Sequence, residues 1–389
     1  MAASSVRNLD KSENERKGIL DTFHENFLSR HLRFLDAVDK FKLEVTVLGA
    51  YEIGSCNAAD PDKGCNFKKA ACTLKPTNKK FALANFFIPA FKMLHKFVRN
   101  REIPNDGNMK LLLERLVKFL IRTEIHAALS QMKDCSDETE LIILLIFHLF
   151  SPLSLSSYFT VNQSKSSQPK VCPCGKKHRK IIYGDTSIGN TDVWHGTVDL
   201  IMEGADVIIV TPDKGTSEDL DSREAVKQGQ FDMNNNSAGS SLVQVAAKTI
   251  VHSFYHHQIH PDHSNTLIPC IGVSPTGLIF YFYDSVHDVL LGSTHFPLAT
   301  FSPLHLNWTT VIAVWMVLNH SYLCNGLSSL DIDEVPKSHF LDIARSKLDI
   351  YKHELQRGRV GTRHFSVFNL NPNSFINAKF IAAPELADL

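Results

Sequence analysis

Carboxylates and lysines that could work together occur in the middle of this 389-residue chain. Asp199 lies inside the apolar run 194–202, and Asp213 and Lys214 directly follow a second apolar run, 207–211. A hard divalent cation such as magnesium needs at least two oxygen ligands, which Asp199 and Asp213 would supply if the two runs were neighbours. A lysine beside such a cation can orient an attacking water. The residue types therefore indicate metal-assisted chemistry.

Both carboxylates also have a structural interpretation. A carboxylate inside an apolar strand is expensive to bury without partners, so Asp199 either serves a site or accepts a bond from a nearby backbone donor at a strand end. Pro212, Asp213, Lys214 and Gly215 together are typical of a solvated turn. The sequence leaves these alternatives open.

Three soft ligands, Cys172, Cys174 and His178, occur in one short segment. Structural zinc sites use four Cys or His ligands, so this spacing predicts a zinc site that needs one more ligand. The candidates for the fourth position are Cys56, Cys65, Cys72 and His195. The alternative is a loop that carries unligated thiols.

Basic residues surround the same cysteines and form the best candidate in the sequence for contacting nucleic-acid phosphates. They are Lys170, Lys176, Lys177, His178, Arg179 and Lys180. So short a cluster is also typical of a solvated surface.

Histidines crowd residues 252–263. His252 and His256 are one helical turn apart and could chelate a metal. Histidines at the C-terminal end of a helix also suit its dipole, which favours a structural role.

The elements that would position Asp199 follow from apolar periodicity. Residues 197–202 and 207–211 are predicted to be antiparallel neighbouring strands. Residues 242–254 have helical spacing, and residues 267–273 and 278–283 are predicted to form a hairpin. The expected order is strand, strand, helix, strand, strand, with residues 212–241 as a long polar loop.

This stretch, about residues 180–284, resembles the PD-(D/E)XK nuclease superfamily, in which one strand carries Asp, the next carries Glu-x-Lys, and a helix follows. The segment around Asp199 is similar to the first element, and residues 208–211 are similar to the second strand. The helix from Leu242, with Gln244 and Lys248 one turn apart, resembles the Gln-bearing helix of the exonuclease-like branches of the superfamily. The second strand has no Glu-x-Lys, so the resemblance implies that Asp213 replaces the Glu and Lys248 the Lys.

The resemblance implies magnesium-dependent cleavage of phosphodiester bonds in DNA or RNA. Asp199 and Asp213 would bind the magnesium, Lys248 or Lys214 would stabilise developing charge, and Gln244 would position water or phosphate. An acidic residue on a preceding helix completes some such sites, and the candidates are Glu140 and Glu124.

Two other classes of function stay open. The missing Glu-x-Lys favours a catalytically degenerate nuclease-like domain that binds nucleic acid or protein. A protein-interaction role without nucleic acid fits the zero net charge, which results from 41 basic and 41 acidic residues.

The predicted fold class is α/β, with a helical N-terminal part packed on a mixed-sheet core of the restriction-endonuclease kind. Residues 1–160 are predicted to be mainly helical, residues 170–330 to form the nuclease-like core, and residues 331–389 to form a C-terminal helix and a surface tail. The polar linker 162–169 marks the main boundary.

Individual elements are expected outside the core as well. Helices are predicted over 10–40, 81–99 (interrupted at Pro89), 109–132, 136–150, 305–324 and 337–355. Residues 49–78 contain glycines, prolines and three cysteines and are predicted to form a long loop.

Composition favours a folded protein inside the cell, cytoplasmic or nuclear. Eight cysteines over this length are too sparse for a disulfide framework, and the first residues do not form a secretory signal. The apolar segment 305–324 is interrupted by polar residues and is expected to be a buried helix and not a membrane span. The sequence makes no prediction of oligomeric state.

Overall fold

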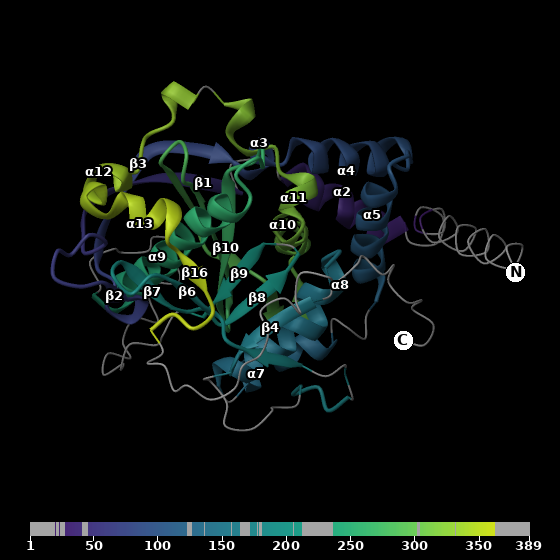
Figure 1. Cartoon of the computed structure of the whole chain (residues 1–389). Helices are drawn as coiled ribbons and strands as arrows, with labels where there is room; N and C mark the ends of the chain where they lie inside the picture. The colour runs from purple at the N-terminus through teal and green to yellow at the C-terminus, as the bar shows by residue number, and fades with distance from the viewer. Residues whose placement is uncertain are drawn as a thin grey trace, which may run out of the picture.

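A ten-stranded mixed sheet forms the centre of the part of the chain that the structure describes (Figure 1). This computed structural model describes residues 20, 23, 28–40, 46–122, 127–135, 137–156, 158–163, 172–176, 178, 181–204, 206–211, 236–301, 304–330 and 332–361. Helices pack on the sheet, so the predicted α/β class is confirmed at that level.

The strands follow the order β3-β1-β12-β11-β10-β9-β8-β4-β5, with β13 beside β11. Their bounds are β1 Val47–Cys56, β3 Cys72–Ala82, β4 Tyr158–Asn162, β5 Ile182–Gly184, β8 Leu200–Glu203, β9 Val207–Val210, β10 Leu267–Ser274, β11 Gly277–Asp284, β12 Val289–Ser293 and β13 Phe296–Pro297. Strands from both sides of the predicted boundary at 162–169 therefore share one sheet.

The predicted order strand, strand, helix, strand, strand is confirmed. β8 and β9 are antiparallel, with Leu200 opposite Ile209. Helix α9 (Asn236–Ile259) crosses back so that β10 runs parallel to β9, as a helical crossover requires. β10 and β11 form the expected antiparallel hairpin.

The apolar run 194–202, in which residues 197–202 are predicted to be one strand, is not continuous, and that prediction is wrong. It divides into β7 (Trp194–Thr197), which belongs to a separate sheet, and β8. Val198 donates its backbone N–H to the Thr186 carbonyl, and the Thr186 hydroxyl donates to the Val198 carbonyl at 2.5 Å. Because these bonds hold the chain where it passes between sheets, Asp199 lies at a break and not inside a strand.

The long loop predicted over 49–78 is also wrong. β1 and β3 pair with each other there, and β1 pairs with β12. β3 is an edge strand with mostly exposed side chains, so it lacks the apolar pattern of a buried strand. Pro76 fits an edge strand because its missing N–H need not join a ladder.

Both faces of the sheet are covered (Figure 1). Ile201, Ile208 and Val210 belong to the apolar cluster formed with α9. Leu200 and Ile209, on the other face, belong to the cluster of the N-terminal helices. This alternation makes β9 a fully buried strand and buries β8 except at Glu203.

The helices on the face away from α9 begin in the N-terminal region. They include α2 Leu28–Lys40, α3 Leu83–Phe86, α4 Ile88–Asn100, α5 Gly107–Ile121, α7 Glu138–Leu145, α8 Ser151–Leu153, α10 Trp308–Leu318 and α11 His320–Leu323. The predicted break at Pro89 is confirmed, because Pro89 lies in the first turn of α4.

Three other predicted helices are shorter than expected. In the helix predicted over 109–132, α5 ends at Ile121, and residues 127–129 and η2 (Ser130–Asp134) form further short helical segments. The helix predicted over 305–324 begins only at Trp308 because residues 304–306 form β15. The one over 337–355 is divided into α12 (Phe340–Ile343) and α13 (Leu348–His353).

The remaining strands are β2 Cys65–Asn66, β6 Ser187–Gly189, β14 Ala299–Phe301, β15 Leu304–Leu306 and β16 Gln356–Arg357. The strands β16-β6-β7-β2 form a four-stranded sheet. Among the described helices, none has both the length and the apolar character needed to cross a bilayer.

Candidate functional site

Asp199 is buried, with 3% of its surface exposed, where the chain enters β8. Its Oδ2 accepts a hydrogen bond from the backbone N–H of Thr211 at 2.6 Å. Thr211 directly follows β9, so this bond joins the two ends of the β8–β9 hairpin. The structural role that the sequence allowed for Asp199 is therefore present.

A second carboxylate, that of Glu138, is hydrogen-bonded to the side chain of Thr211. The Thr211 hydroxyl donates to Oε2 of Glu138 at 3.2 Å. Glu138 is in the first turn of α7, whose N-cap Asp137 accepts the N–H groups of Thr139 and Glu140. The two acidic groups thus flank one threonine, and both offer hard oxygen ligands.

Glu138 was not among the acidic residues proposed from the sequence, which were Glu140 and Glu124. Glu124 lies outside the described residues. The acidic first turn of α7 was visible in the sequence, but spacing alone does not tell which carboxylate of that turn faces β9.

Lys248 and Gln244 are one turn apart on α9, and both are buried. The helix packs on the sheet face that carries Cys270 of β10. Burial raises the pKa of the Cys270 thiol to about 12, while the Lys248 ammonium lowers that pKa and the Asp199 carboxylate raises it. Both charged groups therefore affect the pKa of the same buried thiol.

Two predicted site residues, Asp213 and Lys214, lie outside the described residues. The preceding strand, β9, consists of four buried apolar residues where the nuclease pattern has Glu-x-Lys. Of the predicted catalytic set, the structure describes Asp199, Gln244 and Lys248.

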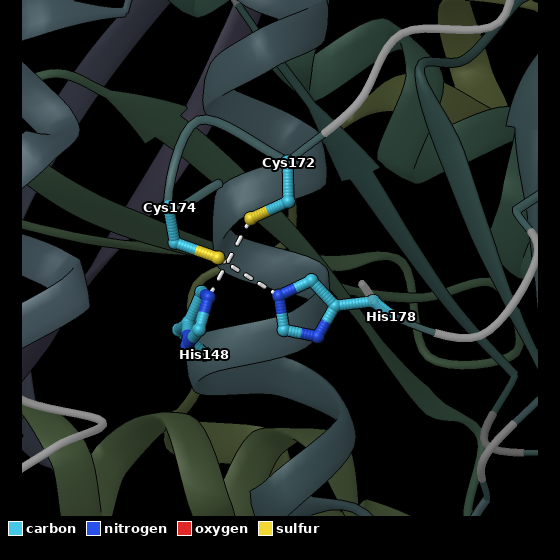
Figure 2. Close-up of side chains that lie close together, drawn as sticks. All are labelled: His148, Cys172, Cys174 and His178. Atoms are coloured by element: carbon cyan, nitrogen blue, oxygen red, sulfur yellow. Dashed lines mark hydrogen bonds between the residues drawn. The ribbon is translucent and has the colours of Figure 1, made fainter. Parts of the chain in front are cut away.

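A second cluster of possible metal ligands consists of His148, Cys172, Cys174 and His178 (Figure 2). The four possible ligand atoms all lie within 4.8 Å of one another. Cys172 Sγ is 3.5 Å from His148 Nε2, and Cys174 Sγ is 2.9 Å from His178 Nε2. Two sulfurs and two imidazole nitrogens that converge in this way are able to hold a metal ion.

The fourth member of this group, His148, was missed by the sequence analysis. None of the four candidates, Cys56, Cys65, Cys72 and His195, belongs to the group. His148 lies in a π-helical turn (η3, Ile146–Phe150) that continues α7, and such turns occur frequently at functional sites. A histidine inside an otherwise apolar helix was the only sign in the sequence.

Packing fixes the orientation of the two imidazoles. The His178 ring stacks on Phe147 with centroids 4.3 Å apart, and it meets the His148 ring edge-on at 5.0 Å. Burial lowers the pKa of His148 to about 4, so its ring is neutral near pH 7. The neutral imidazole is the form that coordinates metals.

The basic cluster around these cysteines is only partly described. Lys176 and His178 are within the described residues, whereas Lys170, Lys177, Arg179 and Lys180 are outside them. The predicted phosphate-contacting patch therefore stays a prediction.

The structure also groups Asp206, His256 and His260 as possible metal ligands at the far end of α9. The sequence suggested His252 and His256 as a metal-binding pair, but the structure groups His256 with Asp206 and His260. His252 Nε2 instead lies 3.0 Å from the Asp206 carbonyl oxygen.

No known protein family, curated protein or solved structure matches this chain.

Proposed function

We propose that this chain is a divalent-metal-dependent nuclease of the restriction-endonuclease-like kind, with Asp199, Glu138 and Lys248 at its active site. The observation that carries the proposal is the link from Asp199 through Thr211 to Glu138. It joins two carboxylates from different elements at one end of the β8–β9 hairpin. Lys248 is buried on α9, which packs on β9 and β10.

The connection of the strands supports the same proposal. A hairpin with an aspartate beside its first strand is followed by a helix that bears Gln244 and Lys248. The next strand, β10, returns parallel to β9. This matches the order of elements that the resemblance implied, although the second strand lacks Glu-x-Lys.

The donor set fits magnesium, which prefers carboxylate oxygens. When bound, magnesium would polarise a phosphodiester and make water a better nucleophile. Asp199 and Glu138 would hold the ion, and Asp213 is proposed as a further ligand. The Lys248 ammonium would stabilise negative charge on the phosphate in the transition state, and the Gln244 amide would orient water or phosphate.

Cleavage assays with the full chain test this proposal. Single- and double-stranded DNA and RNA would be incubated with magnesium or manganese and wild-type protein, Asp199→Asn or Lys248→Met. Asp192→Asn, a change of an exposed carboxylate on the same segment, is the matched control. We expect cleavage by wild type and control, and rates lower by about a hundredfold or more in the two site variants.

The other outcomes separate the competing functions. Binding without cleavage by wild type would support the degenerate nucleic-acid-binding module. If the wild type neither binds nor cleaves these nucleic acids, a nucleic-acid role is rejected. Equal cleavage by wild type and Asp199→Asn would reject the site.

We also propose that His148, Cys172, Cys174 and His178 bind a structural zinc ion. Tetrahedral ligands at the usual zinc–sulfur and zinc–nitrogen distances lie about 3.5 Å apart. The Cys172–His148 pair is separated by 3.5 Å, and the Cys174–His178 pair, at 2.9 Å, would open slightly around the ion. Two cysteines with two histidines complete a closed coordination set, which is typical of structural and not catalytic zinc. The ion would fasten the segment 172–178 to the helix that begins with Glu138.

A further inference from the structure

Asp206, His256 and His260 meet where the β8–β9 turn touches the C-terminal end of α9. Their possible ligand atoms all lie within 4.8 Å of one another. The aspartate and the two histidines come from segments about fifty residues apart, so the meeting results from the fold and not from local sequence.

Asp206 and His256 are close enough for an ion pair when the imidazole is protonated, and their separation also fits coordination of one metal ion. Asp206 Oδ2 and His256 Nε2 are 3.4 Å apart, which is long for a charge-assisted hydrogen bond. Oxygen and nitrogen ligands of one tetrahedral zinc ion lie about 3.4 Å apart. The His256 and His260 rings have centroids 4.9 Å apart, as expected for residues one helical turn apart on one face.

The group is held in place by bonds that do not use its ligand atoms. His252 Nε2 lies 3.0 Å from the Asp206 carbonyl oxygen, which ties the turn to α9. Asp206 has a left-handed backbone conformation (φ 50°), which fixes the tight turn after Gly204. The His263 ring packs edge-on against His256 at 5.6 Å and limits its rotation. Asp206 and His256 are therefore positioned before any ion binds.

One side of the group is open to solvent. His256 is buried, Asp206 is partly exposed, and His260 is exposed. An ion held by three protein ligands would thus keep a position for water, unlike the closed set of cysteines and histidines. Two imidazoles with one carboxylate favour zinc or another first-row transition ion over magnesium, which prefers oxygen ligands.

We infer that Asp206, His256 and His260 form a second metal site, for zinc or a similar transition ion, that clamps the β8–β9 turn onto α9. This site is separate from the Cys172 group and does not depend on nuclease activity. Its occupancy stabilises the folded chain, because the unfolded chain does not bring the turn and the helix together.

Zinc titration of the chelator-treated full chain by calorimetry tests the inference. His260→Gln removes an exposed ligand and should leave the fold intact, and His257→Gln changes a neighbouring histidine outside the group as the matched control. We expect wild type and His257→Gln to bind one more zinc per chain than His260→Gln. Zinc should also raise the melting temperature of wild type and His257→Gln more than that of His260→Gln.

Asp206→Asn provides a second variant, since it keeps the size of the side chain and removes the ligand charge. We expect its affinity at this site to fall at least about tenfold. Equal stoichiometry and affinity in wild type, His260→Gln and Asp206→Asn would overturn the site. A loss in His257→Gln as large as that in His260→Gln would also overturn it, because it would indicate unspecific binding by the histidine run.

Discussion

The Asp199 carboxylate accepts the backbone N–H of Thr211 at 2.6 Å, and this bond joins the entrance of β8 to the exit of β9. Because the donor is a backbone group, the contact is independent of the side chain at position 211. The Thr211 hydroxyl, which this contact does not use, donates a hydrogen bond to the Glu138 carboxylate. The structural contribution of Asp199 and the proposed catalytic contribution of Glu138 can therefore be separated by substitution.

Thr211→Val tests that separation. Valine keeps the shape and the backbone N–H to Asp199, but it removes the hydroxyl that donates to Glu138. We expect a loss of about 1 kcal/mol in the free energy of unfolding and weaker cleavage, because Glu138 loses the hydrogen bond from the Thr211 hydroxyl. Urea unfolding and cleavage rates measure the two effects.

Thr191→Val, a change of an exposed threonine, is the control for Thr211→Val. If both variants unfold and cleave like wild type, the Thr211–Glu138 contact has no role in the site.

The zinc proposal predicts which cysteine and histidine substitutions remove metal. His148→Gln and Cys174→Ser should each lower the zinc content of the purified chain by about one ion per chain, since structural zinc needs all four ligands. Cys65→Ser should not lower it, because Cys65 is outside the group. Elemental analysis of each variant gives the count.

Zinc removal also has a predicted effect on stability. Strong chelators should lower the melting temperature of wild type, because the free energy of binding a structural ion contributes to folding. No change of melting temperature on chelation, with zinc shown to be removed, would argue against a structural ion.

Acidification should destabilise the fold through His252. Burial lowers its folded-state pKa to about 4 from the ordinary value of 6.5, so the unfolded chain binds the proton more readily. The stabilising effect is complete above about pH 6.5 and is lost as the pH falls toward 4. Between about pH 7 and pH 5, His252 alone should cost about 2 kcal/mol.

Urea unfolding of chelator-treated wild type and His252→Gln at both pH values measures this cost. The variant should lose less free energy of unfolding on acidification than wild type does. Equal losses in the two proteins would mean that His252 titrates normally in the folded chain.

The buried centre of the fold could be predicted from the sequence. β8, β9, β10 and β11 are short apolar runs between turn residues, and α9 has clear helical spacing. Those patterns arise from burial between two covered faces. β1 and β3 were missed because an edge strand needs few apolar residues, and its glycines and Pro76 are also typical of loops.

The candidate sites were predictable only in part. Asp199 stood out as a charged residue within an apolar run, Lys248 was named only through the resemblance, and Cys172, Cys174 and His178 stood out by spacing. His148 and Glu138 contribute through tertiary contacts between distant segments, which no local pattern encodes.

The most direct test of the proposed active site is a manganese-binding titration, in which electron paramagnetic resonance measures the concentration of the free ion. The parent protein is the His260→Gln variant loaded with zinc. In this variant the group of Asp206, His256 and His260 does not contribute to the number of manganese ions bound. We predict that Asp199→Asn in this parent loses about one manganese ion per chain, whereas Asp192→Asn loses none. If the Asp199→Asn chain binds manganese as tightly as its parent, Asp199 is not a metal ligand and the proposed nuclease site is wrong.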